Sequence, residues 1–406
     1  MEIQAIYGNV IGLDVHQKQI TAAALTLNQQ GQVDHEIKVF GTFKKDLQSL
    51  VQWAKDKCPE LIVMESTGIY WKSPYQALEK AGLTTIMVNA RAVAKVPGRK
   101  TDVSDSCWLA MLARSGLLKA GFVPPADLDA LRILSRQRQK LTQCLAAEKN
   151  RLSKVLAGAG IRLGTLVSDP HGQAARRMTQ CLIDGGSPGE ALALAGKRLK
   201  AEPTDLLAAL DGELTANHRF VLKEIMSHVV ELEHRIDRLG NQLLEGLAPH
   251  QWALDLLQTI PGLDQMGAAM LLVEIGPEMS VFGSAERLAS WAGLCPGNNE
   301  SAGKRKPGKM LKGNQWVRRI LCEAANAAQR TTCMFQSKYK SLAYTRGHKR
   351  TIMALAHKML RIVFGILNKR EPYKDSTVDY EELMVKKKAP RWIAALMRYR
   401  LLPQSL

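Results

Sequence analysis

The sequence predicts an α/β domain of the ribonuclease-H-like kind, followed by long coiled-coil helices and a mostly helical C-terminal region. Three observations predict this. Residues 1–120 alternate strand-like and helix-like patterns, no G-x-G-x-x-G follows the first strand as a Rossmann fold would require, and the pattern becomes helical after Pro124-Pro125. The content of 46% apolar and 23% charged residues excludes a disordered chain.

The N-terminal domain, residues 1–122, opens with a hairpin-like pattern. Residues 10–25 and 32–40 are rich in β-branched and alternating apolar residues, and the short apolar runs 61–64 and 85–88 fit buried strands. Helical patterns lie between and after these strands, at residues 44–57, 74–80 and 102–119.

Residues 123–250 are predicted to be a helical, coiled-coil region. Residues 128–156 and 220–247 keep apolar side chains at helical spacing among many polar ones, and an insertion of about 158–212 joins them. Helices of this length with a single apolar stripe need a partner, either in a helical hairpin or in a coiled coil between subunits.

Residues 251–375 are predicted to form a second compact domain, and residues 376–406 a basic tail. Residues 256–276 read as helix, Pro-Gly turn and small-residue helix, which is typical of a helix-hairpin-helix element. Such a turn can offer backbone N–H groups to a phosphate, although a tight hairpin without a ligand fits this segment equally well.

Charge is concentrated in one part of the chain. The formal net charge is +18, and residues 304–370 contain 17 Lys or Arg and a single acid, Glu323, which is a net +16. This excess favours a polyphosphate partner, that is, a nucleic acid, over a basic surface with no ligand. The predicted nucleic-acid-binding residues are Lys304, Arg305, Lys306, Lys309, Lys312, Arg318 and Arg319.

Other classes of protein fit the sequence poorly. No apolar run reaches the roughly 18 residues of a membrane-spanning helix, and the N-terminus lacks a signal-peptide pattern, so we expect a cytoplasmic protein without a membrane partner. The seven cysteines include no C-x-x-C pair, which argues against a disulfide framework or a thiolate zinc site.

Four carboxylates of the N-terminal domain are candidate metal ligands. Asp14 lies within an apolar strand, Glu65 ends another, and Asp102 and Asp105 stand three apart at a helix start. Each has a structural explanation, as a solvated strand end or a helix cap. Together they can converge beside the sheet, where mutual repulsion favours a hard cation, Mg²⁺ or Mn²⁺, able to assist phosphoryl transfer. His16 could approach this site, or be a surface histidine.

A second candidate site lies at residues 293–306. Ser301 is followed by small residues and then by a basic run, so it is placed to meet a phosphate whose developing charge Lys and Arg could stabilise. On spacing alone, a serine in this position is more often a turn residue than a nucleophile, and Cys295 is a competing nucleophile.

These motifs closely resemble the DEDD-type transposases of the one-ten insertion-sequence family, in particular its eleven-eleven subgroup, which is related to the Piv DNA invertases. The resemblance rests on IGLDVHQK, VMESTGIYW, GRKTDVSDSCWLA, IPGLDQMGAAMLLVEIG, FGSAERLASWAGLCPG and NNESAGKRKPGKMLKGNQWVRRIL, in this order. It implies a RuvC-like domain with a tetrad at Asp14, Glu65, Asp102 and Asp105, a coiled coil, and a C-terminal transposase domain with a nucleophilic serine at Ser301.

The resemblance also implies a mechanism and partners. Members of this family are recombinases guided by a structured non-coding RNA, the bridge or seeker RNA, whose loops pair with donor and target double-stranded DNA. The serine would form a covalent link to a DNA phosphate that Mg²⁺ activates. The expected assembly is a tetramer built from dimers, acting at the bacterial nucleoid, with the tetrad and the serine of each site contributed by different chains.

Two alternatives remain at this stage. A RuvC-type nuclease or junction resolvase would use the same tetrad without a serine, and would form no covalent adduct. A non-catalytic nucleic-acid-binding protein would need only the basic region, and would not depend on a divalent metal.

Overall fold

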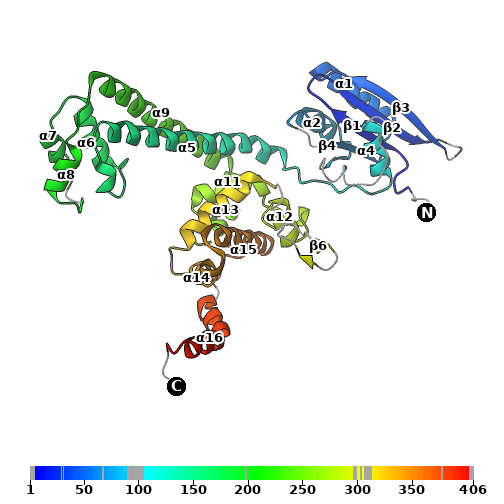
Figure 1. The fold of residues 1–406 in the computed structure, drawn as a ribbon. Coiled ribbons are helices and arrows are strands. Elements are labelled where there is room, and N and C mark those ends of the chain that lie inside the picture. Colours follow the sequence, from blue (N-terminus) through cyan, green and yellow to red (C-terminus); the bar gives the residue numbers. More distant parts are fainter. Residues whose placement is uncertain are drawn as a thin grey trace. The chain divides into compact units, whose positions relative to one another are not determined.

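The chain separates into two compact units, Met1–Val123 and Pro124–Leu406. Figure 1 shows the fold of a computed structural model. The structure describes residues 5–28, 30, 32–65, 68–88, 93, 105–196, 199–295, 300–301, 304–305, 313–375 and 378–401.

The first unit is built on a five-stranded sheet of order β3-β2-β1-β4-β5. The first three strands form an antiparallel meander, while β4 and β5 run parallel to β1. This order and these directions are those of a ribonuclease-H-like sheet, so the predicted fold class is confirmed. The strands are β1 Val10–Val15, β2 Ile20–Leu27, β3 Val33–Phe40, β4 Leu61–Glu65 and β5 Thr85–Val88.

Helices cover both faces of this sheet because alternate strand residues point to opposite sides. On one face, Leu13 and Met64 belong to a core with Leu50 and Trp53 of α1 (Lys44–Asp56) and with α2 (Lys72–Lys80). On the other face, Val10, Leu61 and Val63 pack against Leu109 and Leu112 of α4 (Asp105–Arg114).

Helix α4 is shorter than the helix that we expected at residues 102–119. It ends at Arg114 because Gly116 adopts a left-handed conformation, with φ +65°. The N–H of Leu117 then donates to the carbonyl of Leu112, which closes the helix end. Residues 102–104 lie outside the described residues.

The two predicted long helices are present as α5 (Ala126–Gly158) and α9 (Ala216–Gly246), and they pack against each other within the chain. The insertion between them has a core of its own, in which Leu152 and Ile225 of the long helices meet Met178, Leu182 and Leu206. Its elements are η1 Leu163–Thr165, α6 Gln173–Ile183, α7 Pro188–Ala193 and α8 Pro203–Leu210.

The C-terminal part of the second unit is mostly helical, as expected, and α15 lies at its centre with α12, α13 and α14 packed on it. The predicted helix, Pro-Gly turn and helix are α10 and α11. Gly262 in that turn has φ +84° and lies so close to α13 that a β-carbon would come within 2.3 Å of the Ala324 carbonyl oxygen. The elements are η2 Ala248–His250, α10 Gln251–Gln258, α11 Gln265–Ile275, η3 Met279–Val281, α12 Ala285–Trp291, β6 Glu300–Ser301, β7 Lys304–Arg305, α13 Gln315–Ala328, α14 Met334–Arg346, α15 His348–Lys369 and α16 Tyr380–Arg398.

Helix α15 is also long and apolar enough, by length and composition, to cross a membrane. Its apolar run is interrupted by Lys358 and Arg361, which is why the sequence showed no uninterrupted stretch. Leu355, Met359 and Val363 are at most 1% exposed inside the C-terminal region. This is the burial of a core helix.

Candidate active site and nucleic-acid interface

The sheet register brings Asp14 and Glu65 together. The parallel pairing of β1 and β4 sets Leu13 opposite Met64, so Asp14 and Glu65 occupy the next position along each strand. Because strand residues alternate between faces, both carboxylates are on the face opposite Leu13 and Met64, which is the face that α4 covers.

Helix α4 brings its first residue, Asp105, toward the same place. It runs antiparallel to β1, since the carbonyl of Arg114 at its end accepts N–H groups from Ile6 and Tyr7, ahead of the strand. Near its start, the Ser106 carbonyl is so close to Gly12 that a β-carbon there would come within 2.0 Å of the oxygen. Asp105 therefore begins the helix at the Asp14 end of the sheet.

Three of the four predicted tetrad positions thus share one edge of one face, while Asp102 lies outside the described residues. Asp14 is paired with His16, whose Nε2 lies 3.2 Å from a carboxylate oxygen of Asp14. The His16 side chain is 64% exposed, so the histidine is at the surface and yet in contact with the site. A cavity of about 560 Å³ opens beside this edge, with Lys18 and Tyr70 in its lining.

The donor set fits a hard divalent cation. The three carboxylates supply only oxygen atoms, which Mg²⁺ and Mn²⁺ prefer, and carboxylates gathered at one edge repel one another unless a cation lies between them. As the side chains stand, no group of three or more His, Cys, Asp or Glu among the described residues is arranged closely enough to hold a metal.

Ser301 lies in a short hairpin of the second unit. Strands β6 and β7 pair antiparallel, with Ser301 opposite Lys304 and Glu300 opposite Arg305. Backbone pairing therefore sets one predicted basic residue, Lys304, directly opposite Ser301, and a second, Arg305, opposite the residue before it.

Cys295, the competing nucleophile, is half-buried, and burial raises the pKa of its thiol. The thiolate is the reactive form of cysteine, so this shift makes Cys295 a poor nucleophile near neutral pH.

The other predicted nucleic-acid-binding residues fall into two groups. Arg318 and Arg319 lie on α13, where Arg318 is half-buried and the exposed Arg319 pairs with Glu323 at 3.1 Å. Lys306, Lys309 and Lys312 lie outside the described residues.

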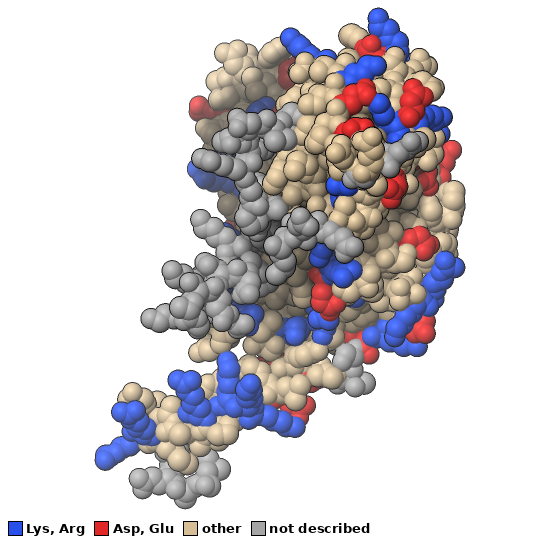
Figure 2. Space-filling view, turned by 90° about the vertical axis from the view of Figure 1, so that its right-hand side faces the viewer, with Lys and Arg blue, Asp and Glu red and all other residues tan. Residues whose placement is uncertain are grey.

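The basic tail contains α16, where Lys and Arg side chains gather on the surface (Figure 2).

Two features escaped the sequence analysis. One is Glu274 on α11, a fully buried carboxylate bonded by Arg132 and Arg136 of α5. The signal was a charge inside the apolar run LLVEIG, the same signal that drew attention to Asp14. The other is a basic pocket between α12, α14 and α15, whose Lys and Arg residues the sequence showed only as part of the net charge.

Comparisons with known proteins agree with this arrangement. Residues 11–161 match the DEDD model of IS110, described as "Transposase", and residues 254–340 match "Transposase IS116/IS110/IS902 family". These matches define the chain as a transposase, a DNA-processing enzyme. It belongs to the IS110 family of transposases, the one-ten family that the motifs indicated.

Individual relatives are distant but extensive. A "Putative transposase y4pF/y4sB" of Sinorhizobium fredii is 26% identical over 82% of this chain and 79% of its own length. "Insertion element IS900 uncharacterized 42 kDa protein" of Mycobacterium paratuberculosis is 24% identical over 73% of this chain and 80% of its own length. The "Transposase for insertion sequence element IS1111A" of Coxiella burnetii is 27% identical over 46% of this chain and 52% of its own length.

Among solved structures, Thermus thermophilus RuvC in complex with a Holliday junction substrate matches with a TM-score of 0.22 and 13% identity, over 28% of this chain and 99% of RuvC. The fold assignment therefore depends on the strand order and directions described above.

Proposed function

We propose that this transposase is an RNA-guided recombinase that cleaves and exchanges DNA strands through Ser301, assisted by Mg²⁺ at the carboxylate edge. The observation that carries the proposal is the convergence of Asp14, Glu65 and Asp105 on one face of a ribonuclease-H-like sheet, in a member of this family. Asp102 would complete the set of ligands.

In the proposed reaction, Oγ of Ser301 forms a bond to a DNA phosphorus while the bond from that phosphorus to a deoxyribose oxygen breaks. The serine proton leaves and the departing oxygen gains one. Attack by the free hydroxyl of another strand then releases the serine, so the number of phosphodiester bonds is conserved and no cofactor is consumed. When bound, Mg²⁺ (or Mn²⁺) activates the phosphate and stabilises the departing oxygen.

The residues of this chain would have separate roles in this reaction. The carboxylates would hold the cation, and Asp14, which contacts His16 in this structure, would be one of its ligands. Lys304 and Arg305, paired across the hairpin from Ser301 and Glu300, would stabilise the charge that develops on the phosphate. The neutral, half-buried Cys295 would take no part.

The partners follow from the same resemblance. The basic region would bind a structured guide RNA whose loops pair with donor and target duplexes, within the bacterial cytoplasm at the nucleoid. The carboxylates and Ser301 lie in different units of the chain. By the same resemblance, the assembly would be a tetramer built from dimers, in which one chain supplies the tetrad and another supplies the serine.

The proposal is tested by a recombination assay with purified protein, donor and target DNA, and RNA from the element. We expect activity to require both the RNA and Mg²⁺ or Mn²⁺, and to be poor with Ca²⁺, whose coordination is longer and looser. Asp14→Asn, Glu65→Gln, Asp102→Asn and Asp105→Asn should each abolish recombination while nucleic-acid binding persists.

The alternatives predict different results. Metal-dependent cleavage without any RNA requirement or covalent adduct would indicate a RuvC-type nuclease or resolvase. Binding with no metal-dependent chemistry would indicate a nucleic-acid-binding protein. Near-normal recombination by the Asp105→Asn variant would return that residue to the role of a helix cap.

A further inference from the structure

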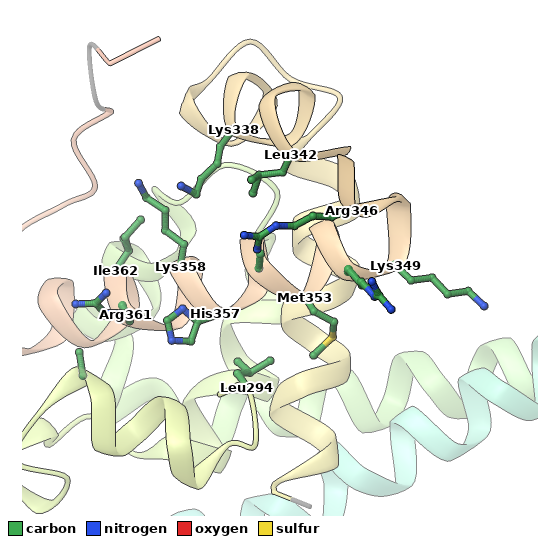
Figure 3. A pocket seen from close by; sticks show the side chains of 13 residues that line it. Leu294, Lys338, Leu342, Arg346, Lys349, Met353, His357, Lys358, Arg361 and Ile362 are labelled. Atoms are coloured by element: carbon green, nitrogen blue, oxygen red, sulfur yellow. The ribbon is translucent and has the colours of Figure 1, made fainter. Parts of the chain in front are cut away.

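A basic pocket opens between α12, α14 and α15, and its volume is about 970 Å³ (Figure 3). This is at the upper end of the roughly 300–1,000 Å³ of pockets that enclose small ligands. Six cationic side chains and one histidine line it, with no Asp or Glu among the described lining residues. The charged residues are Lys338, Arg346, Lys349, Arg350, Lys358 and Arg361, together with His357.

These cations have few acidic neighbours. Arg361 pairs with Glu286 of α12 at 2.7 Å, whereas Arg346, Lys349 and Arg350 form no ion pair within the described part of the chain. Lys338 and Lys358 come from different helices, and both lie over the ring of Tyr380, at 4.3 and 4.5 Å from its centroid. In Figure 3 the two lysines approach each other, with Arg346 directed toward the same space.

The concentration of positive charge destabilises the protein when no anion is bound. Burial lowers the pKa of Lys338, and the charges of Lys358 and Arg346 lower it further. Burial also lowers the pKa of His357, with a further contribution from Arg361. Cations that destabilise one another in this way gain when an anion enters between them.

The rest of the described lining is apolar. We call these apolar residues the floor and the Lys and Arg side chains the rim; the floor consists of Ala285, Leu294, Leu342, Met353, Ala354 and Ile362. A phosphate on its own gains nothing from such a floor, and the paired bases of a duplex are held inside the helix. A base that has left its stack gains from burying its faces on apolar side chains, while its flanking phosphates reach the cations at the rim.

We propose that this pocket binds an unpaired nucleotide of a nucleic-acid partner, with the base on the floor formed by Leu294, Met353 and Ala354 and the phosphates on the surrounding Lys and Arg side chains. The inference rests on the proposed function in assuming that the partner is a nucleic acid. It adds that this face of the transposase domain selects single-stranded or looped-out positions. Unpaired RNA and unpaired DNA share this chemistry, and the experiment separates them.

The test uses the full chain and three oligonucleotide probes of one sequence, namely single-stranded RNA, single-stranded DNA and duplex DNA, each carrying 2-aminopurine. Stacking quenches this base, so its fluorescence should rise when it enters the pocket of the wild-type protein as part of a single strand. The stronger rise among the two single strands identifies the source. Duplex DNA should show no rise.

Two kinds of variant examine the floor and the rim separately. Ala354→Phe fills the floor without altering charge and should remove the fluorescence rise. Arg346→Glu with Arg350→Glu reverses the rim and should weaken single-strand binding at least about tenfold at low salt, because fewer phosphates are then neutralised. The matched control reverses Lys223 and Lys374, two exposed lysines outside both the pocket lining and residues 304–370, and should change single-strand binding much less.

Melting temperatures should show that the variants fold, and Ile362→Asn replaces Ala354→Phe if the latter does not. The proposal is overturned if the floor variants leave the fluorescence rise intact, or if the rim variant weakens duplex binding as much as single-strand binding. Normal recombination with no effect of any pocket variant would reject only the pocket. Pocket-dependent binding by a protein that does not recombine would reject only the proposed function.

Discussion

The long helix α5 is tied to its neighbours near both ends by a carboxylate held between two cations, but the two junctions differ in burial. Near the N-terminal end, Arg132 and Arg136 hold Glu274 of α11, which is fully buried. Near the C-terminal end, Lys149 shares Glu233 of α9 with Arg176 of the insertion, and Glu233 is 28% exposed. The same arrangement of charges is therefore buried at one junction and partly exposed to water at the other.

The buried junction also includes the residue that caps α13. Arg136 donates to both carboxylate oxygens of Glu274, at 2.8 and 3.0 Å, and the side-chain amide of Asn314 donates to one of them at 2.8 Å. Asn314 also caps α13 by accepting the N–H groups of Trp316 and Val317. The network thus fixes the start of α13, which follows the segment that contains Ser301.

This difference in burial determines what each junction contributes to the structure. Glu274 is fully buried and Arg132 is 10% exposed, so water cannot replace either partner, and the Glu274 network defines one geometry. Glu233 keeps contact with water, so its network can be weakened in steps by pH. We therefore assign the positioning of the start of α13 to the first junction, and the docking of the insertion to the second.

The largest expected effect concerns Glu274→Gln. It removes the buried negative charge between Arg132 and Arg136, leaving Arg132 with Asp129 at 4.0 Å, and should lower the free energy of unfolding by about 3–5 kcal/mol. Denaturant titration would measure it, with Glu231→Gln as the control because Glu231 is 56% exposed in its pair with Arg235. A decrease below about 1 kcal/mol, similar to that of an exposed pair, would remove the distinction between the junctions.

An intermediate effect is expected at Glu233. Hydrogen bonds from Arg176 and Lys149 lower its pKa to about 2, against the effect of burial. A carboxyl with a lowered pKa stabilises the fold above its ordinary pKa near 4.5, and this contribution disappears as the pH falls toward 2. The shift corresponds to roughly 3 kcal/mol, which solvent screening at this partly exposed site reduces to about 2 kcal/mol.

Glu233→Gln should therefore be less stable than the wild type at neutral pH, and the two should converge as the pH falls from about 4.5 to about 2. Thermal unfolding followed at a series of pH values would measure the difference. A difference that stayed constant down to the lowest pH would mean that the charge of Glu233 has no part in it.

The smallest expected effect concerns nucleic-acid binding, not the stability of the two junctions. Charge reversal at Lys304, Arg305, Lys306 and Lys309 should flatten the salt dependence of duplex binding, by about 0.9 in the logarithmic slope for each phosphate that is no longer neutralised. The Glu233 variant should leave this slope unchanged, because Glu233 lies on α9, outside the basic region. An unaltered slope after the four reversals would make that region a solvated surface.

Much of the N-terminal site could be predicted because it depends on local patterns. A charge in an apolar strand marked Asp14, and a strand end marked Glu65. The parallel register then brings them together, and this follows from the fold class. The close approach of Gly12 and Ser106, which directs Asp105 to the same edge, is a tertiary packing detail that no local pattern reveals.

The second unit was less predictable because its main features depend on contacts between residues far apart in the sequence. The two long helices follow from apolar spacing, whereas the bonds from Arg132 and Arg136 to Glu274 join residues about 140 positions apart. The basic pocket likewise requires three helices to meet, and the sequence showed only its net charge.

The central claim is that Ser301 is the nucleophile, and the most direct measurement is the detection of its bond to DNA. The reaction would be trapped on a nicked or mismatched substrate in the presence of guide RNA and Mg²⁺, the protein digested, and the modified peptide mapped by mass spectrometry. We predict an adduct on Ser301 in the wild type, none in Ser301→Ala although that variant still folds and binds RNA, and at most a trace in Ser301→Cys. An adduct on Cys295 or Tyr344, or cleavage with free hydroxyl ends and no adduct at any stage, would contradict the account.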